Sequence, residues 1–164
     1  MIIAEFCQNH NGSFDEILRM LEAVAETGAD AVKLQHIFAE DLSYRAAFEE
    51  GLVEREVTKA IKRPYETEYD RLKGLEIKNE DVARFIEAAR SFNLIPLTTC
   101  FSHSRIDEIK TLGFEAIKVA SYDCGSFPFI RRLVEQFGTV IVSTGASYDD
   151  EIIKTEIAIL NSIV

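Results

Sequence analysis

Short apolar runs alternate with amphipathic stretches along most of the chain. Five runs are mostly apolar without strict alternation of polar and apolar positions, as expected for parallel strands covered on both faces: Ile2–Glu5, Ala31–Gln35, Ile95–Thr99, Ala116–Ala120 and Val140–Thr144. Apolar residues at helical spacing follow these runs. The pattern therefore predicts five β-then-α units, which belong to the α/β class of folds.

Several helix starts carry a recognisable signal. Ser13, with a glutamate three residues later, has the pattern of a capping box, and Gly28 stands where the chain must leave that helix. We expect the side chain of Asn79 to cap the next clear helix. Ser104 and Ser147 each precede an aspartate by three positions, which is a weaker form of the same signal.

The segment from Asp41 to Lys78 interrupts the alternation. It is long, polar and mixed in character, and it contains Pro64. We predict that it is a substrate-facing insertion with one or two short helices. No linker divides the chain, and 164 residues with 47% apolar content suffice for one core, so a single domain is expected.

Alternating strands and helices imply a parallel sheet with right-handed crossovers, which allows two architectures. Eight units close a barrel of about 250 residues, whereas five units form either an incomplete barrel or an open, doubly wound sheet. The pattern alone leaves this choice open. In both architectures ligands bind at the carboxyl ends of the strands, so the predicted place of the site does not depend on the choice.

The charge balance restricts the function. The chain has 18 basic and 28 acidic residues, a formal net charge of −10, which argues against binding to nucleic acid or to an acidic membrane. An anionic substrate therefore needs positive charges that are local to its site. No apolar run approaches the roughly 20 residues of a spanning helix, so a cytoplasmic protein is expected. Three cysteines without CxxC spacing suggest reduced thiols.

Two lysines are the sharpest chemical signal, because Lys33 and Lys118 each interrupt a strand that is expected to be buried. A buried ammonium group is costly unless a carboxylate or an anionic ligand compensates its charge. Two interpretations stay open: an ion pair with an internal carboxylate such as Glu5, or a shared site for a small anion. Ser143, which begins a Ser-Thr-Gly sequence, adds hydroxyl and backbone donors that favour the anion site.

Other polar residues at the strand ends allow more than one function. Glu5 could orient a lysine, act as a general base or hold a sugar hydroxyl. Gln35 lies two residues after Lys33 and hence on the same strand face, where it either binds a ligand or is a satisfied core residue. A three-histidine metal site is a further hypothesis, since three histidines follow strand ends: His10, His36 and His103.

Five sequence blocks occur in a fixed order: IIAE-x3-NHNG at Ile2–Gly12, GADAVKLQ at Gly28–Gln35, TTCF at Thr98–Phe101, IKVAS at Ile117–Ser121 and IVSTG at Ile141–Gly145. As a set they resemble the sialic acid synthase (N-acetylneuraminate synthase) family, which includes the pseudaminic and legionaminic acid synthases. The resemblance covers essentially the whole chain. It implies that residues 1–164 are the N-terminal portion of a TIM-type (β/α) barrel, about five βα units, with the later strands and the antifreeze-like C-terminal domain of the family absent.

The resemblance also implies a reaction. Members of the family condense phosphoenolpyruvate with an N-acetylated amino sugar, such as N-acetylmannosamine, to give a nonulosonic acid and phosphate. Matching blocks identify Glu5 as the catalytic carboxylate beside the reacting carbons, and Gln35 and Asp123 as residues that face the sugar. They assign five residues to phosphoenolpyruvate: Lys33, Thr99, Lys118, Ser121 and Ser143.

The metal and the sugar are less well defined by the resemblance. The family uses a divalent metal, Mn or Mg, whose histidine ligands lie on later strands, so no metal ligand is expected in this chain. We therefore expect these residues by themselves to be inactive or nearly so. The chain departs from the family pattern at five positions: Phe6, Cys7, Thr98, Cys100 and Tyr122. These changes crowd the sugar side, and the identity of the sugar stays open.

Two other hypotheses belong to different functional classes. A non-catalytic half-barrel module could bind anions and self-associate, because an open barrel exposes a strand edge and an apolar lumen. Another barrel aldolase could use Lys33 or Lys118 to form a Schiff base with its substrate. For the synthase itself we expect a homodimer or another self-associated form.

Overall fold

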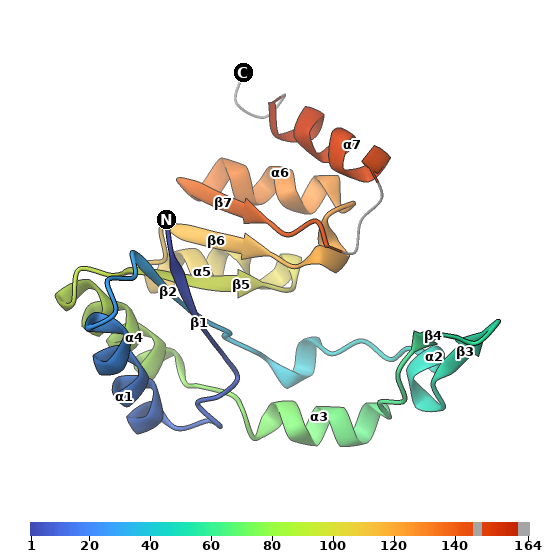
Figure 1. Ribbon diagram of the computed structural model, residues 1–164, viewed down its shortest axis with the longest axis horizontal. Coiled ribbons are helices and arrows are strands. Elements are labelled where there is room, and N and C mark those ends of the chain that lie inside the picture. Colours follow the sequence, from blue (N-terminus) through green and yellow to red (C-terminus); the bar gives the residue numbers. More distant parts are fainter. Residues whose placement is uncertain (146–148, 161–164) are drawn as a thin grey trace. The chain divides into compact units, whose positions relative to one another are not determined.

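The computed structural model describes residues 1–145 and 149–160, and its central feature is a parallel five-stranded sheet (Figure 1). The strands lie in the order of the chain: β1 (Ile3–Cys7), β2 (Ala31–Leu34), β5 (Ile95–Cys100), β6 (Ala116–Val119) and β7 (Thr139–Val142). A helix follows each strand, after a separate segment in the case of β2: α1 (Phe14–Ala25), α4 (Asn79–Ser91), α5 (Ile106–Leu112), α6 (Phe127–Gln136) and α7 (Asp149–Leu160). The predicted strands and the β-then-α order are thus confirmed, with small shifts at the strand ends.

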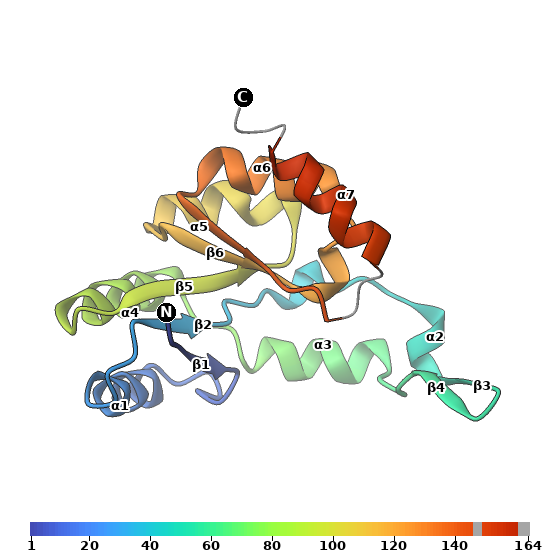
Figure 2. The same cartoon turned by 45° about the horizontal axis from the view of Figure 1, so that its top comes forward.

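The strand order decides between the two architectures. A doubly wound sheet reverses its direction of growth, whereas here every new strand adds beside the preceding one. With right-handed crossovers, this order places the helices on one side of the sheet. Figure 2 shows α5 and α6 along the same side of β6 and β7. The sheet with its helices is therefore a partial TIM-type barrel, as predicted.

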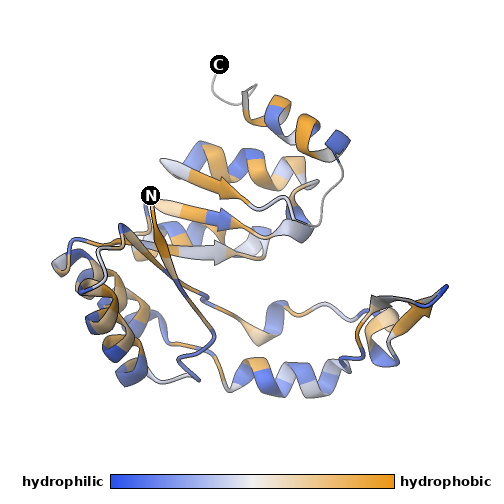
Figure 3. Ribbon diagram, in the orientation of Figure 1, coloured by the Kyte–Doolittle hydropathy of each residue, from blue (hydrophilic) through white to orange (hydrophobic). Residues whose placement is uncertain are grey.

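The two faces of the sheet are packed differently. The outer face carries the large core, in which Val32, Leu34, Ile117 and Val119 belong to one cluster with apolar residues of α1, α4, α5 and α6. Hydrophobic and hydrophilic residues alternate along these helices in Figure 3, as expected for helices with one buried side. The inner face carries a separate small cluster: Ala31, Leu97 and Ala116, with Ile3 and Ile141 packed beside them. Residues on the inner face are therefore separated from the main core.

The predicted helix starts have mixed outcomes. Ser13 caps α1 as predicted, because its Oγ accepts from the backbone N–H of Glu16 at 3.4 Å. Asn79 is not a cap, since it lies inside α4 and its side chain bonds to residues outside that helix. Ser104 is not a cap either, because it lies in the 3-10 helix η2 (His103–Arg105), which precedes α5. Ser147 lies outside the described residues.

Residues 37–76 form a second compact unit, distinct from the unit made of residues 1–36 and 77–164. It contains the 3-10 helix η1 (Ala39–Asp41), α2 (Ala46–Glu49), the antiparallel pair β3 (Leu52–Glu54) and β4 (Val57–Ala60), and α3 (Tyr65–Lys73). The two short helices agree with the prediction, but the hairpin was not predicted. Its turn residues Arg55 and Glu56 have φ of 48° and 65°, without the asparagine or glycine that usually signals such a turn.

Two further findings concern the whole described chain. None of the described helices combines the length and the apolar character that crossing a bilayer requires. Within the described residues, Cys7, Cys100 and Cys124 form no disulfide bond.

Candidate active site on the inner face of the sheet

The strand register places four of the predicted residues on the inner face. Glu5 pairs with Lys33 across β1 and β2, and Thr99 pairs with Lys118 across β5 and β6. Leu97, two residues before Thr99, pairs with Lys33. Because side chains two residues apart share a face and paired residues of parallel strands lie side by side, these four side chains share the face of the small apolar cluster.

Lys33 has two close partners for its ammonium group. The residue is only 2% exposed, and its Nζ atom lies 2.7 Å from Glu5 Oε2 and donates to Thr99 Oγ1 at 3.1 Å. The side chain of Glu5 is 38% exposed, and its Oε1 accepts from the backbone N–H of Cys7 at 2.9 Å. The ion-pair interpretation is therefore correct for Lys33, whose charge is compensated by an internal carboxylate.

Lys118 is different, because it is partly buried and forms no ion pair or hydrogen bond with any residue that the structure describes. Its pKa is lowered, first by burial and then by the positive charge of Lys33, while Glu5 and Cys7 act in the opposite direction. Two ammonium groups and one carboxylate thus lie close together. The local excess of positive charge, in a chain with a net charge of −10, favours an anionic ligand.

Cys7 belongs to the same group of side chains. The sequence pattern did not predict that Cys7 would lie there. The register between β1 and β2 shifts between Glu5 and Cys7, which marks a β-bulge. Cys7 has φ of 51°, in the left-handed region that favours glycine. Burial and then the carboxylate of Glu5 raise the pKa of its thiol, which also shares a hydrogen bond with Glu5. The closeness of Cys7 to Glu5 in the sequence was the available signal, but no local pattern indicates the bulge.

Ser121 and Ser143 lie at the carboxyl ends of neighbouring strands. Ser121 begins the 3-10 helix η3 (Ser121–Asp123), which follows β6. Ser143 follows β7, and its backbone N–H donates to the carbonyl oxygen of Val119 at 3.2 Å, so the ladder between β6 and β7 extends to this residue. Ile141, two residues earlier, pairs with Lys118, so Ser143 lies on the inner face next to Lys118 along the strand direction.

The two residues assigned to the sugar lie on different loops. Gln35 follows β2; its backbone N–H donates to the carbonyl of Cys7 at 3.3 Å, and its Oε1 accepts from Gln8 Nε2 at 3.2 Å. Asp123 ends η3 and is partly buried, while the preceding Tyr122 is 81% exposed. Both loops leave the carboxyl ends of strands, as predicted.

The three histidines do not come together. His10 and His36 are both buried, and His36 affects the pKa of His10, so these two lie near each other. The ring of His103 instead packs against that of Phe129, tilted by 57°, with 4.8 Å between the ring centroids. Within residues 1–145 and 149–160, no group of three or more His, Cys, Asp or Glu residues is placed to hold a metal ion. The three-histidine hypothesis is therefore wrong, and the described residues do not fit the divalent metal that the resemblance implies.

His36 begins a line of hydrogen bonds that joins β2 to α4 and α5. Its Nε2 lies 3.0 Å from Asn79 Oδ1, and Asn79 Nδ2 donates to Glu108 Oε1 at 2.7 Å. Arg105 donates to the other oxygen of Glu108 at 2.9 Å. The bond from Asn79 is the main reason why the pKa of Glu108 is lowered. The side chain of Asn79 therefore links elements of the fold, where the sequence suggested a helix cap.

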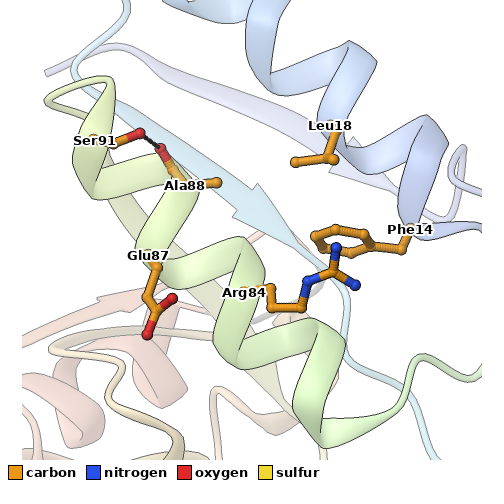
Figure 4. Close-up of a pocket in the computed structure, with 6 residues that line it drawn as sticks. All are labelled: Phe14, Leu18, Arg84, Glu87, Ala88 and Ser91. Atoms are coloured by element: carbon orange, nitrogen blue, oxygen red, sulfur yellow. Dashed lines mark hydrogen bonds between the residues drawn. The ribbon is translucent and has the colours of Figure 1, made fainter.

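A shallow groove also exists on the outer surface, between α1 and α4 (Figure 4). The guanidinium of Arg84 lies over the ring of Phe14, 3.9 Å from its centroid. The lining residues are Phe14, Leu18, Arg84, Glu87, Ala88 and Ser91. None of them is a predicted site residue, so this groove is separate from the polar group on the inner face.

Comparison with known proteins gives consistent matches along the chain. The sequence pattern of the family described as the NeuB family matches residues 20–162. The N,N'-diacetyllegionaminic acid synthase of Legionella pneumophila is 31% identical over 144 residues, which are 88% of this chain and 39% of that protein. A pseudaminic acid synthase of Campylobacter jejuni is 25% identical over 162 residues, 93% of this chain and 43% of that protein. The chain thus spans about two fifths of the length of these relatives.

A solved structure supports the fold. The N-acetylneuraminic acid (sialic acid) synthetase of Leptospira borgpetersenii superposes with a TM-score of 0.79 at 23% sequence identity, covering 99% of this chain and 50% of that one. At this level of identity the likeness concerns the fold alone. It agrees with the partial barrel that follows from the strand order.

Proposed function

We propose the following function because this chain belongs to the NeuB family. The chain provides the phosphoenolpyruvate-binding part of a synthase that joins phosphoenolpyruvate to an N-acetylated amino sugar and releases a nonulosonic acid and phosphate. The names of its relatives support this proposal, because they are synthases of legionaminic and pseudaminic acids.

The positive charge on the inner face is the observation that carries the proposal. Lys33 uses two of its three N–H donors on Glu5 and Thr99, and Lys118 has no partner among the described residues. Phosphoenolpyruvate is small and carries a carboxylate and a phosphate, so it matches two ammonium groups that emerge from inner strands. Preorganised cations of this kind hold an anion without reorganising at the moment of reaction.

The remaining contacts follow from the register. We assign Lys33, Thr99 and Lys118 to phosphoenolpyruvate because they share the inner face. Ser121 and Ser143 stand at the carboxyl ends of β6 and β7, where their hydroxyl and backbone groups would complete the anion site. No residue in the described ranges is assigned to a metal.

Glu5 is the proposed catalytic carboxylate. In the reaction, C3 of phosphoenolpyruvate bonds to the aldehyde carbon of the open-chain sugar, whose oxygen takes up a proton. Water then adds at C2 and phosphate leaves. Glu5 is held by Lys33 and by the Cys7 N–H, and its partial exposure allows it to accept the proton of the attacking water. Gln35 and Asp123 would orient the sugar.

Calorimetric titration with phosphoenolpyruvate tests the anion site. We expect Lys118→Met to weaken binding about 10- to 100-fold, the value of one charge-assisted hydrogen bond. Lys62→Met is the matched control, because Lys62 pairs with Glu50 at 2.9 Å on the surface of the other compact unit. Equal affinities of the wild type and Lys118→Met, or no binding by the wild type, would contradict the proposal. Phosphate release by a synthase that contains these residues within a complete barrel, measured with a panel of N-acetylated amino sugars, then tests the reaction.

A Schiff-base aldolase is a second candidate, favoured by the lowered pKa of Lys118. Burial and a neighbouring cation increase the fraction of neutral, nucleophilic amine. Borohydride reduction in the presence of pyruvate would then leave a stable adduct on Lys118, detectable by mass spectrometry. Reversible phosphoenolpyruvate binding without any adduct would remove this candidate.

A further inference from the structure

The loop between β1 and α1 meets Gln35 at three points. The carbonyl of Cys7 accepts from the backbone N–H of Gln35 at 3.3 Å, and Gln8 Nε2 donates to Gln35 Oε1 at 3.2 Å. At the third point the backbone of Gln35 faces the ring of His10 and raises the pKa of that ring. All these residues belong to one compact unit. Gln35 is therefore held mainly by a loop whose histidine has no function so far.

The hydrogen bonds of His10 determine where its proton lies. His10 is fully buried, and its Nδ1 accepts from the backbone N–H of Gly12 at 3.1 Å. A neutral ring that accepts at Nδ1 must carry its proton on Nε2. Burial lowers the pKa of His10, which favours this neutral form. His10 Nε2 is thus a buried N–H donor.

The backbone of Gln35 is the candidate acceptor for this donor. His10 Nε2 has no partner at normal hydrogen-bond distance among the described residues. The backbone of Gln35 nevertheless raises the pKa of the ring, which is the effect of a carbonyl that faces the ring N–H. Buried donors are nearly always paired, so a small approach of the loop to Gln35 is favourable. Contacts of this kind are often long before a ligand binds and shorten in the complex.

We propose that His10 is a positioning residue, whose Nε2–H holds the backbone of Gln35 and thereby fixes the Gln35 side chain for the amino sugar. The inference rests on the proposed function, which assigns Gln35 to the sugar. His10 itself is fully buried and acts only through Gln35. A purely steric function would need neither of the two ring nitrogens, so variants that keep one nitrogen function at a time distinguish the two possibilities.

His10→Asn and His10→Gln separate the two bonds. The asparagine amide oxygen can replace Nδ1 as acceptor for Gly12 but does not reach Gln35, whereas the glutamine amide nitrogen can replace Nε2 as donor to Gln35. In a synthase that contains these residues within a complete barrel, we expect His10→Asn to raise the KM for the sugar about three- to tenfold, the value of one neutral hydrogen bond. His10→Gln should stay close to the wild type. The KM for phosphoenolpyruvate should not change in either variant.

His103→Asn is the matched control, because it removes a histidine that packs against Phe129 outside this loop. Equal effects of the two His10 variants on the KM for the sugar, or a matching rise in the KM for phosphoenolpyruvate, would overturn the positioning function.

Amide hydrogen exchange gives a readout that does not depend on turnover. His10→Asn should speed exchange of the Gln35 amide and leave the Gly12 amide protected. His10→Gln should speed exchange of the Gly12 amide and leave the Gln35 amide protected. If the wild type does not bind phosphoenolpyruvate, the proposed function fails, and these exchange rates still decide the inference. Unchanged exchange at Gln35 in His10→Asn would refute it.

Discussion

Replacing Glu5 with glutamine tests the electrostatic balance of the candidate site. Glu5 Oε2 lies 2.7 Å from Nζ of Lys33, whose side chain is 3% exposed. Glu5→Gln keeps the shape and one acceptor oxygen but removes the negative charge beside Lys33 and Lys118. A buried charge left without its partner costs about 3–5 kcal/mol. Because the Glu5 side chain is 38% exposed and glutamine still accepts, we expect a loss of about 2 kcal/mol in the free energy of unfolding.

Replacing Lys33, the other partner of this ion pair, should destabilise the protein less than Glu5→Gln does. Lys33→Met removes the buried charge itself and leaves Glu5 with access to water and with its bond from the Cys7 N–H. Because the remaining Glu5 carboxylate is 38% exposed, no buried charge is left without a partner, and we expect a loss below about 1 kcal/mol. The two partners of one ion pair should therefore differ in their effect on stability.

Bound phosphoenolpyruvate should offset the loss of stability caused by Glu5→Gln. Without the carboxylate, the two ammonium groups attract phosphoenolpyruvate more strongly than in the wild type. Ligand at about 100 times its dissociation constant stabilises a folded protein by about 2.7 kcal/mol, which is enough to restore the expected loss. We thus expect Glu5→Gln to bind phosphoenolpyruvate more tightly than the wild type, and to abolish phosphate release in a synthase that contains these residues within a complete barrel.

Urea denaturation followed by circular dichroism, with and without phosphoenolpyruvate, measures these differences. Glu50→Gln is the matched control, because it removes the carboxylate of an exposed pair with Lys62 at 2.9 Å. This control should change stability by less than about 0.5 kcal/mol. The reasoning is refuted if Glu5→Gln and Lys33→Met destabilise equally, or if phosphoenolpyruvate stabilises Glu5→Gln no more than the wild type.

The pKa of Lys118 is lowered from 10.5, and a bound anion should raise it again. At alkaline pH below 10.5, binding of phosphoenolpyruvate should therefore be accompanied by proton uptake. Calorimetry in buffers of different ionisation enthalpy measures this uptake. The pKa of His10 is lowered from 6.5, so the unfolded chain binds a proton that the folded chain does not. Stability should therefore fall as the pH drops below about 6.5, and His10→Asn should lack that part of the slope. Asn79→Ala should cost about 1–3 kcal/mol in chemical denaturation, since it removes bonds to buried His36 and to Glu108. An NMR titration of that variant should show a higher pKa for the Glu108 carboxyl.

Patterns that depend on near neighbours were predictable from the sequence. The five strands are apolar runs whose composition fits burial on both faces, and Ser13 caps its own helix three residues away. Asn79 shows the limit of such patterns. A capping residue and a residue that bonds to distant partners look the same in a sequence, and His36 lies 43 positions away. The hairpin of β3 and β4 escaped prediction because its turn lacks the usual residues.

Some features of the candidate site were likewise predictable from the sequence, and others were not. The sequence by itself determined which polar groups stand at the carboxyl ends of the strands, because strand positions follow from local apolar patterning. Only the tertiary structure decided that Lys33 pairs with Glu5, 28 positions away, and with Thr99, 66 positions away, and that Lys118 shares neither contact. The physical reason is that these contacts depend on the register between strands and on the bulge at Cys7, which arise only when the sheet assembles.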